Sequence, residues 1–199
     1  MPKIARLEEV LAAAGAVGRG LVAVDGLPCA GKSTLATHIS RTHGFDKIGV
    51  DDFLLPQSRW PSPPTPAFPF QFMRYDELLA AVHSLAATGR CSYSPFDWAT
   101  LSVSPRKRNV SLTRPLLIEG VSALHPDLCE SYALRIFVES DRASLIESSR
   151  VRGLGLWAEA WEKLFVPSAD VYMKTRPQER ADLIFAGRGV NGTTLSQSF

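Results

Sequence analysis

Short, almost wholly apolar runs alternate along the chain with longer segments in which apolar residues recur every three or four positions. An apolar run bounded by turn residues is typical of a buried strand, whereas the wider spacing is typical of a helix. The pattern predicts five strands, at residues 21–24, 47–50, 116–118, 133–138 and 183–186. It predicts helices at residues 4–17, 32–43, 76–88, about 141–152 and about 157–165.

Strands that are nearly all apolar and alternate with helices indicate an α/β fold, with a parallel sheet of about five strands sandwiched by helices. Ligands of such sheets bind beyond the carboxyl ends of the strands. Three of the predicted strands end in an acidic residue, namely Asp25, Asp51 and Glu119. We therefore expect these three residues to lie near a functional site.

Two segments interrupt the alternation of strands and helices. Residues 56–72 are rich in proline, which fixes φ and removes backbone donors, so we predict an irregular loop there. Its part from Trp60 to Phe72, which mixes prolines with aromatic residues, could be a rim over a binding pocket or a mobile surface loop. Residues 90–114 hold short alternating runs that predict a hairpin. Its basic cluster Arg106-Lys107-Arg108 is interpreted as a solvated hairpin tip, with contact to nucleic acid as the alternative.

Composition narrows the class of protein. The 199 residues suit a single α/β domain over residues 1–199, opened by the helix within residues 1–19. A net charge of +2 is too mild for a dedicated nucleic-acid binder. Three widely spaced cysteines form neither a metal motif nor a disulfide framework, and no apolar stretch reaches membrane-spanning length. We expect a cytoplasmic protein, either monomeric or a homo-oligomer.

The strongest chemical signal lies between the first predicted strand and the helix at residues 32–43. Gly26-Leu27-Pro28-Cys29-Ala30-Gly31-Lys32-Ser33 fits the phosphate-loop pattern G-x-x-x-x-G-K-[ST], in the strand–loop–helix context that the motif requires. Its glycines let backbone N–H groups surround phosphate oxygens at the positive end of the helix dipole. We predict a P-loop NTPase fold that binds ATP and Mg²⁺. Lys32 would contact the β- and γ-phosphates, Ser33 would ligate Mg²⁺, and Thr34 would contact the α-phosphate.

The acidic strand ends suggest the remaining chemistry. Glu119 could hold Mg²⁺ or a metal-bound water opposite Ser33, or could be a solvated strand-end acid. Phosphoryl transfer to a hydroxyl group needs a carboxylate that orients the acceptor and takes its proton. Either Asp51 or Asp52 could do this, and we favour Asp51. The alternative is that the pair caps a turn.

Five short elements, in a fixed order over residues 20–187, resemble one family. They are Val24-Asp25-Gly26, Val50-Asp51-Asp52-Phe53, Tyr93-Ser94-Pro95-Phe96-Asp97-Trp98, Leu117-Ile118-Glu119-Gly120-Val121 and Arg176-Pro177-Gln178-Glu179-Arg180-Ala181-Asp182. In this order they resemble the uridine kinase and phosphoribulokinase-like branch of P-loop kinases. The phosphate loop is specific only to the superfamily, whereas the Asp-x-Phe, Phe-Asp-Trp and Glu-Gly elements narrow the resemblance to this branch.

The resemblance implies roles for residues at matching positions. Asp51 would be the carboxylate that activates the acceptor hydroxyl, and Glu119 the acid on the metal side. Phe53, Phe96 and Asp97 would contact the acceptor. The implied activity is transfer of the ATP γ-phosphate to a hydroxyl group of a small molecule, with a nucleoside as the first candidate.

The resemblance also implies a lid over the phosphates, at about residues 141–165. Arg150 would be its catalytic arginine, with Arg152 as a second nucleotide-binding candidate, although Arg150 could also be a solvated helix charge. A mobile arginine suits this place because negative charge spreads over the γ-phosphoryl oxygens during transfer. Uridine kinases carry a further arginine pair where this chain has Ile146 and Glu147.

Two more departures leave the acceptor open. Leu101 stands where animal uridine kinases carry a base-reading histidine, and residues 66–72 hold no acidic residue to grip ribose hydroxyls. The acceptor could therefore be another small alcohol, such as a sugar, a sugar phosphate or a pantothenate-like molecule. A non-kinase ATP-binding or ATPase partner protein is the alternative from another class. A GTPase is excluded because the chain lacks the Asn/Thr-Lys-x-Asp element that reads guanine.

Overall fold

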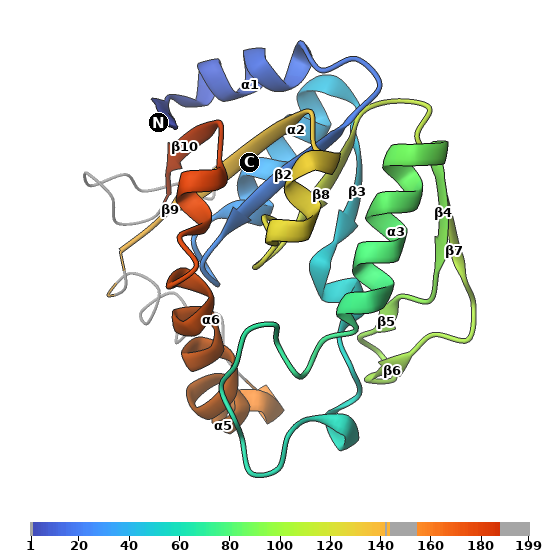
Figure 1. Cartoon of the computed structure of the whole chain (residues 1–199), viewed down its shortest axis with the longest axis vertical. Helices are drawn as coiled ribbons and strands as arrows, with labels where there is room; N and C mark the ends of the chain where they lie inside the picture. The colour runs from blue at the N-terminus through green and yellow to red at the C-terminus, as the bar shows by residue number, and fades with distance from the viewer. Residues whose placement is uncertain (1, 142, 144–154, 188–199) are drawn as a thin grey trace.

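A parallel sheet forms the centre of the computed structural model, which describes residues 2–141, 143 and 155–187 (Figure 1). Its six strands lie in the order β1-β10-β9-β2-β8-β3, and every neighbouring pair is parallel. Their bounds are β1 Lys3–Ala5, β2 Leu21–Gly26, β3 Asp46–Gly49, β8 Leu116–Glu119, β9 Leu134–Glu139 and β10 Leu183–Ala186. The predicted α/β class with a helix-covered parallel sheet is confirmed.

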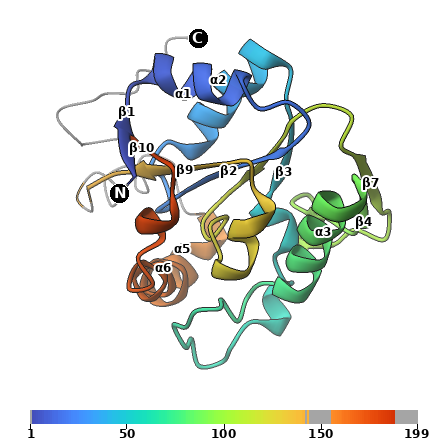
Figure 2. The ribbon, with the colours of Figure 1, turned by 45° about the horizontal axis from the view of Figure 1, so that its top comes forward.

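Helices cover both faces of the sheet. Neighbouring residues of each strand point to opposite faces, so one strand packs with helices on both sides. Val22 and Val24 of β2 pack with helices α1 (Leu7–Gly15) and α2 (Lys32–His43). Leu21 and Ala23 pack on the other face with α3 (Tyr75–Thr88) and α6 (Val166–Met173). Figure 2 shows the two helical layers above and below the strands. The sheet is therefore buried on both sides.

The sixth strand, β1, was not predicted. Residues 4–17 read as one helix, whereas the structure has Ile4 in β1 and starts α1 at Leu7. The strand has three residues, too few to show a period, and lies at the edge of the sheet with Ile4 74% exposed. Its pairing with β10 joins segments about 180 positions apart, and no local pattern reports such a contact.

The C-terminal helical segment is longer than predicted. It runs through η4 (Gly155–Trp157), α5 (Ala158–Ala160), a π-helical turn, η5 (Trp161–Phe165), and α6. The predicted helix ended at about residue 165, whereas α6 continues to Met173, with Pro167 in its first turn, where a missing N–H costs little. The helix predicted at about 141–152 lies outside the described residues, apart from 141 and 143.

The proline-rich segment is packed against the helices. The short helix η1 (Val50–Phe53) precedes it, and the short helix η2 (Gln57–Arg59) lies within it. Phe68 contacts Tyr172 of α6, with 4.6 Å between ring centroids, and the Trp60 ring lies 5.1 Å from that of Trp157. Figure 1 shows the segment crossing from the end of β3 towards α6 and back to α3. It therefore packs against the C-terminal helical segment.

The predicted hairpin is present as an arm beside α3. Strands β4 (Arg90–Tyr93) and β7 (Arg108–Ser111) pair antiparallel, with the small hairpin of β5 (Phe96–Asp97) and β6 (Ser102–Val103) between them. Two short helices, η3 (Pro126–Ser131) and η6 (Pro177–Arg180), complete the described elements. Over the described residues, no helix is both long and apolar enough to cross a membrane.

Candidate functional site

The phosphate loop joins β2 to α2, as predicted, and its backbone requires glycine at both ends. Gly26 has φ +148°, and a Cβ there would lie 2.3 Å from the Val138 carbonyl oxygen. Gly31, with φ +107°, directly precedes the twelve-residue helix α2. Residues with side chains rarely adopt such φ values. The sequence therefore folds into a loop whose last N–H groups lie at the positive end of α2, a favourable place for an anion.

Lys32 lies within this loop and not in solvent. Its side chain is buried, with the residue 7% exposed, and its amine donates a hydrogen bond to the Leu27 carbonyl oxygen at 2.8 Å. The ammonium group thus bends back over the loop that precedes it. From there it can exchange the carbonyl oxygen for a phosphate oxygen without leaving the loop.

Three neighbouring strands bring the predicted polar residues to one level of the carboxyl edge. In the register of the sheet, Glu119 of β8 stands between Val24 of β2 and Gly49 of β3. The phosphate loop follows β2 directly, and the Asp51-Asp52 turn follows β3. The sheet therefore places the loop, Glu119 and the aspartate pair side by side.

Ser33 and Glu119 are in direct contact. The Ser33 hydroxyl donates to Glu119 Oε1 at 3.1 Å, and Glu119 is 9% exposed. The Lys47 amine lies 3.8 Å from Glu119 Oε2 and is the nearby positive charge. A hydroxyl and a carboxylate are oxygen donors of the kind that Mg²⁺ prefers, so the pair fits this ion. Among the described residues no group of three or more metal-binding side chains occurs, so a magnesium ion would also need nucleotide oxygens and water.

A buried carboxylate, that of Asp25, holds the start of the phosphate loop through hydrogen bonds. Asp25 is fully buried and accepts four hydrogen bonds, from the N–H groups of Gly26 (2.6 Å), Ser122 (3.0 Å) and Leu124 (2.8 Å) and from the Tyr172 hydroxyl (2.5 Å). Burial raises the pKa of this carboxyl, while the hydrogen bonds from Tyr172, Leu124 and Gly26 act to lower it. Asp25 thereby joins the start of the loop, the segment after Glu119 and helix α6.

The two aspartates at the end of β3 have different environments. Asp51 is exposed. The Asp52 carboxylate accepts hydrogen bonds from the Tyr93 hydroxyl (2.6 Å) and from Arg108 (3.3 Å). Arg74 donates to the Asp52 carbonyl oxygen at 2.7 Å. The structure thus brings Asp51 to the edge of the sheet on a turn that its neighbour fastens.

The residues expected to contact an acceptor lie at different depths. Phe53 is fully buried and stacks on Tyr93 with 4.7 Å between centroids. Phe96 is 4% exposed, and its centroid lies 5.2 Å from that of Trp98, which is 53% exposed. Asp97 accepts the Ala99 N–H at 2.9 Å and so closes the turn after β5. This hydrogen bond lowers the pKa of Asp97.

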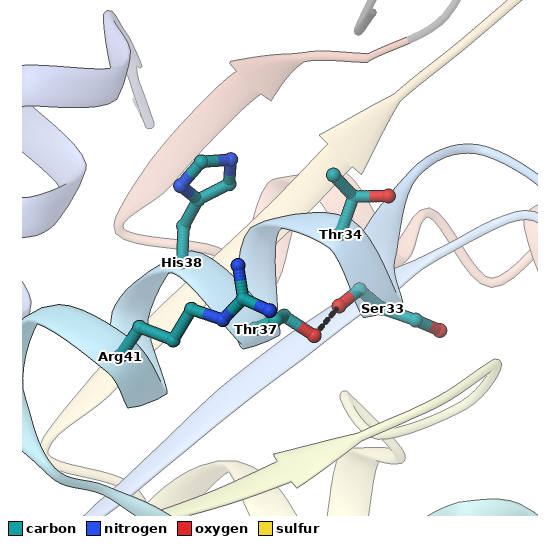
Figure 3. Close-up of a pocket in the computed structure, with 5 residues that line it drawn as sticks. All are labelled: Ser33, Thr34, Thr37, His38 and Arg41. Carbon is teal, nitrogen blue, oxygen red and sulfur yellow. Dashed lines mark hydrogen bonds between the residues drawn. The ribbon is translucent and has the colours of Figure 1, made fainter. Parts of the chain in front are cut away.

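A hollow adjoins the phosphate loop on the outer side of α2 (Figure 3). It has a volume of about 310 Å³ and is lined by Ser33, Thr34, Thr37, His38 and Arg41. The Thr37 hydroxyl donates to the Ser33 carbonyl oxygen at 2.7 Å, which ties the first two turns of the helix together. The predicted lid residues Arg150 and Arg152 lie outside the described residues.

The sequence interpretation missed the contacts that Arg108 makes in the site. Arg108 was read as part of a solvated hairpin tip, and this was wrong: it bonds to Asp52, to the Tyr93 hydroxyl (3.1 Å) and to the Lys47 carbonyl oxygen (2.6 Å). Arg106 and Lys107 are exposed. Alternate residues of a strand face the same side, so the sequence of β7 separates Arg108 from Lys107. Only the register of the hairpin shows that the side of Arg108 faces the aspartate turn.

Comparison with known proteins gives structural neighbours. No protein-family model and no curated protein matches the chain. The structure is similar to that of a possible uridine kinase from Bacillus stearothermophilus, with 21% identity over 90% of this chain and 96% of that chain, at a TM-score of 0.70. A candidate fructose transport system kinase from Silicibacter sp. TM1040 matches with 21% identity over 89% and 98%, at 0.61. D-glycerate 3-kinase from Cryptococcus neoformans matches with 10% identity over 88% and 87%, at 0.50. The chain therefore has the fold of these proteins, and the predicted P-loop NTPase fold is confirmed.

Proposed function

We propose that the protein is a kinase that uses Mg²⁺ and ATP and transfers the γ-phosphate to a hydroxyl group of a small molecule. One observation carries the proposal: the Ser33 hydroxyl is hydrogen-bonded to Glu119 at 3.1 Å, at the mouth of the phosphate loop. The exposed Asp51 follows the adjacent strand. Phosphate loop, metal-binding oxygens and a candidate base are thereby aligned along one edge of the sheet, as phosphoryl transfer requires.

Each residue has a role in this proposal. Lys32 binds the β- and γ-phosphates with its ammonium group, and the N–H groups of the loop hold the phosphate oxygens. Ser33 and Glu119 would hold Mg²⁺, which neutralises charge on the phosphates when it is bound. Asp51 orients the acceptor hydroxyl and accepts its proton.

The acceptor is the open part of the proposal. A nucleoside is favoured by the family resemblance and by the similarity to a possible uridine kinase. Another small alcohol is the second candidate, and the site offers an observation in its favour. Phe70 and Phe72, from the segment where an acidic residue would grip ribose, are buried against each other with stacked rings 5.1 Å apart. Leu101 offers no hydrogen bond to a base.

The test is the formation of ADP from ATP and Mg²⁺ with a panel of nucleosides, sugars, sugar phosphates and vitamin alcohols. Asp51→Asn keeps the shape of the side chain and removes the base. Asp46→Asn, at the exposed start of the same strand, is the matched control. We expect one acceptor class to stimulate ADP formation, with loss of the stimulation in Asp51→Asn and not in Asp46→Asn.

Two other outcomes would change the proposal. Stimulation by a non-nucleoside alone would keep the kinase and replace the acceptor. No stimulation by any member of the panel, with slow ATP hydrolysis equal in both variants, would contradict the kinase and favour an ATP-binding partner protein.

A further inference from the structure

The hairpin arm contacts the aspartate turn through one arginine of its basic cluster. Arg108 opens β7 directly opposite Tyr93 of β4. Its guanidinium donates to Asp52 Oδ2 (3.3 Å), to the Tyr93 hydroxyl (3.1 Å) and to the Lys47 carbonyl oxygen (2.6 Å). A guanidinium that meets three acceptors at once has little freedom to move, because its donors are fixed in one plane.

The tyrosine completes a closed set of contacts. Its hydroxyl donates to Asp52 Oδ2 at 2.6 Å, and its ring stacks on Phe53, the next residue of the turn. Tyr93 is buried, 4% exposed, so its hydroxyl needs this acceptor. The carboxylate of Asp52 and the ring of Phe53 are thus held by the same side chain.

The backbone of the turn is held from a second side. Arg74, just before α3, donates to the carbonyl oxygens of Asp52 (2.7 Å) and Leu54 (3.2 Å). Its guanidinium carbon lies 5.7 Å from the centre of the Phe53 ring. Within residues 50–54, Asp51 is the exposed member, and the contacts above hold Asp52, Phe53 and Leu54 on its C-terminal side.

We propose that Arg108 and Tyr93 are positioning residues, which act through Asp52 to fix the turn that carries Asp51. The inference rests on the proposed kinase function. The acceptor oxygen must lie in line with the phosphate, and a shift of about 1 Å in such a geometry can cost about 100-fold in rate. The arm therefore serves the chemistry without touching the reacting atoms.

The basic cluster Arg106-Lys107-Arg108 supplies both the test variant and its matched control. Arg108→Met removes the three contacts, while Lys107→Met removes an equal charge from an exposed neighbour. We expect Arg108→Met to lower kcat by about tenfold or more with little change in the KM for ATP, and Lys107→Met to leave both unchanged. Arg108→Lys keeps the charge but cannot make three planar contacts, so we expect a partial recovery.

A double-mutant cycle separates positioning from simple loss of fold. If Arg108 acts through Asp52, Arg108→Met should lower kcat further by less than twofold or so when Asp52→Asn is already present. A general destabilisation would instead make the two effects multiply. Multiplying effects, or equal kcat values for Arg108→Met and Lys107→Met, would overturn the inference.

A second measurement does not depend on the acceptor. In protein labelled with ¹³C at aspartate carboxyls, the Asp51 resonance is the one that is lost in Asp51→Asn. We expect Arg108→Met to shift this resonance and Lys107→Met to leave it in place. If the unmodified protein shows no acceptor-dependent activity, the proposed function fails while this shift still decides whether the arm holds the turn; an unmoved resonance would refute it.

Discussion

The hydroxyl of Tyr172 offers a direct test of the buried network beneath the phosphate loop. Tyr172 is 1% exposed and donates to Asp25 Oδ2 at 2.5 Å, while its ring lies 4.6 Å from that of Phe68 between centroids. Tyr172→Phe keeps the ring and its packing and removes only the donor. The change therefore measures one hydrogen bond to a fully buried carboxylate.

The expected loss follows from the charge of the acceptor. A hydrogen bond to a charged group contributes about 1.5–3 kcal/mol to the free energy of unfolding. In a protein of this size each 1 kcal/mol corresponds to a shift of about 2–4 °C in Tm, so we expect Tm to fall by about 3–12 °C. Three backbone donors to Asp25 remain, so the fold should persist.

The control is a second buried tyrosine with a neutral acceptor. Tyr132 donates to the Ala123 carbonyl oxygen at 2.9 Å, so Tyr132→Phe should cost only about 0.5–1.5 kcal/mol. Urea unfolding at neutral pH, followed by tryptophan fluorescence, gives both free energies. If Tyr172→Phe costs no more than Tyr132→Phe, the argument fails, because burial would then have kept Asp25 protonated against its four donors.

Three further predictions concern Glu119 and Lys47 at the candidate metal site, and the buried His125, which follows Leu124, a donor to Asp25. Glu119→Gln should weaken Mg²⁺-dependent binding of ADP by about 10- to 100-fold, measured by calorimetry, because it removes the carboxylate that accepts the hydrogen bond of Ser33. Lys47→Met should strengthen it by at most about fivefold, since the competing amine is 41% exposed; weaker binding would show that Lys47 assists the anion instead. Burial lowers the pKa of His125, and its Nδ1 accepts the Asp127 N–H at 3.2 Å, which only the neutral ring can do. The unfolded chain therefore binds the proton first, so the free energy of unfolding should fall below about pH 6.5, less so in His125→Gln, and unchanged dependence in that variant would contradict this.

The strands and the phosphate loop were predictable because their signals are local. Buried strands such as β8 are nearly continuous apolar runs, and Gly26 and Gly31 report the φ values that the loop needs. Strand β1 and helix α6 were missed for opposite reasons. The strand was too short to show a period, whereas α6 continues a helix that was predicted to end at about residue 165 and has a proline, Pro167, in its first turn.

The supports of the site were not predictable because they join distant parts of the chain. Tyr172 lies 147 positions from Asp25, and Arg108 lies 56 positions from Asp52. Which side of a strand faces a partner depends on register, and a slip of one residue would have turned Arg108 away. A basic cluster therefore reads as one solvated patch in the sequence, although in the structure it divides into two exposed residues and one with three defined contacts.

The two adjacent aspartates, Asp51 and Asp52, also differ in their environments. A carboxylate already bonded to a phenol and a guanidinium, as Asp52 is, has its charge paired and fewer lone pairs for a substrate proton. Asp52 is therefore suited to anchor the turn. Asp51, one residue earlier, is exposed at the edge where Glu119 and Ser33 meet. A transfer reaction needs both properties, a base that can exchange a proton and a turn that does not move, and adjacent residues can supply them when one is exposed and the other is bonded to the arm.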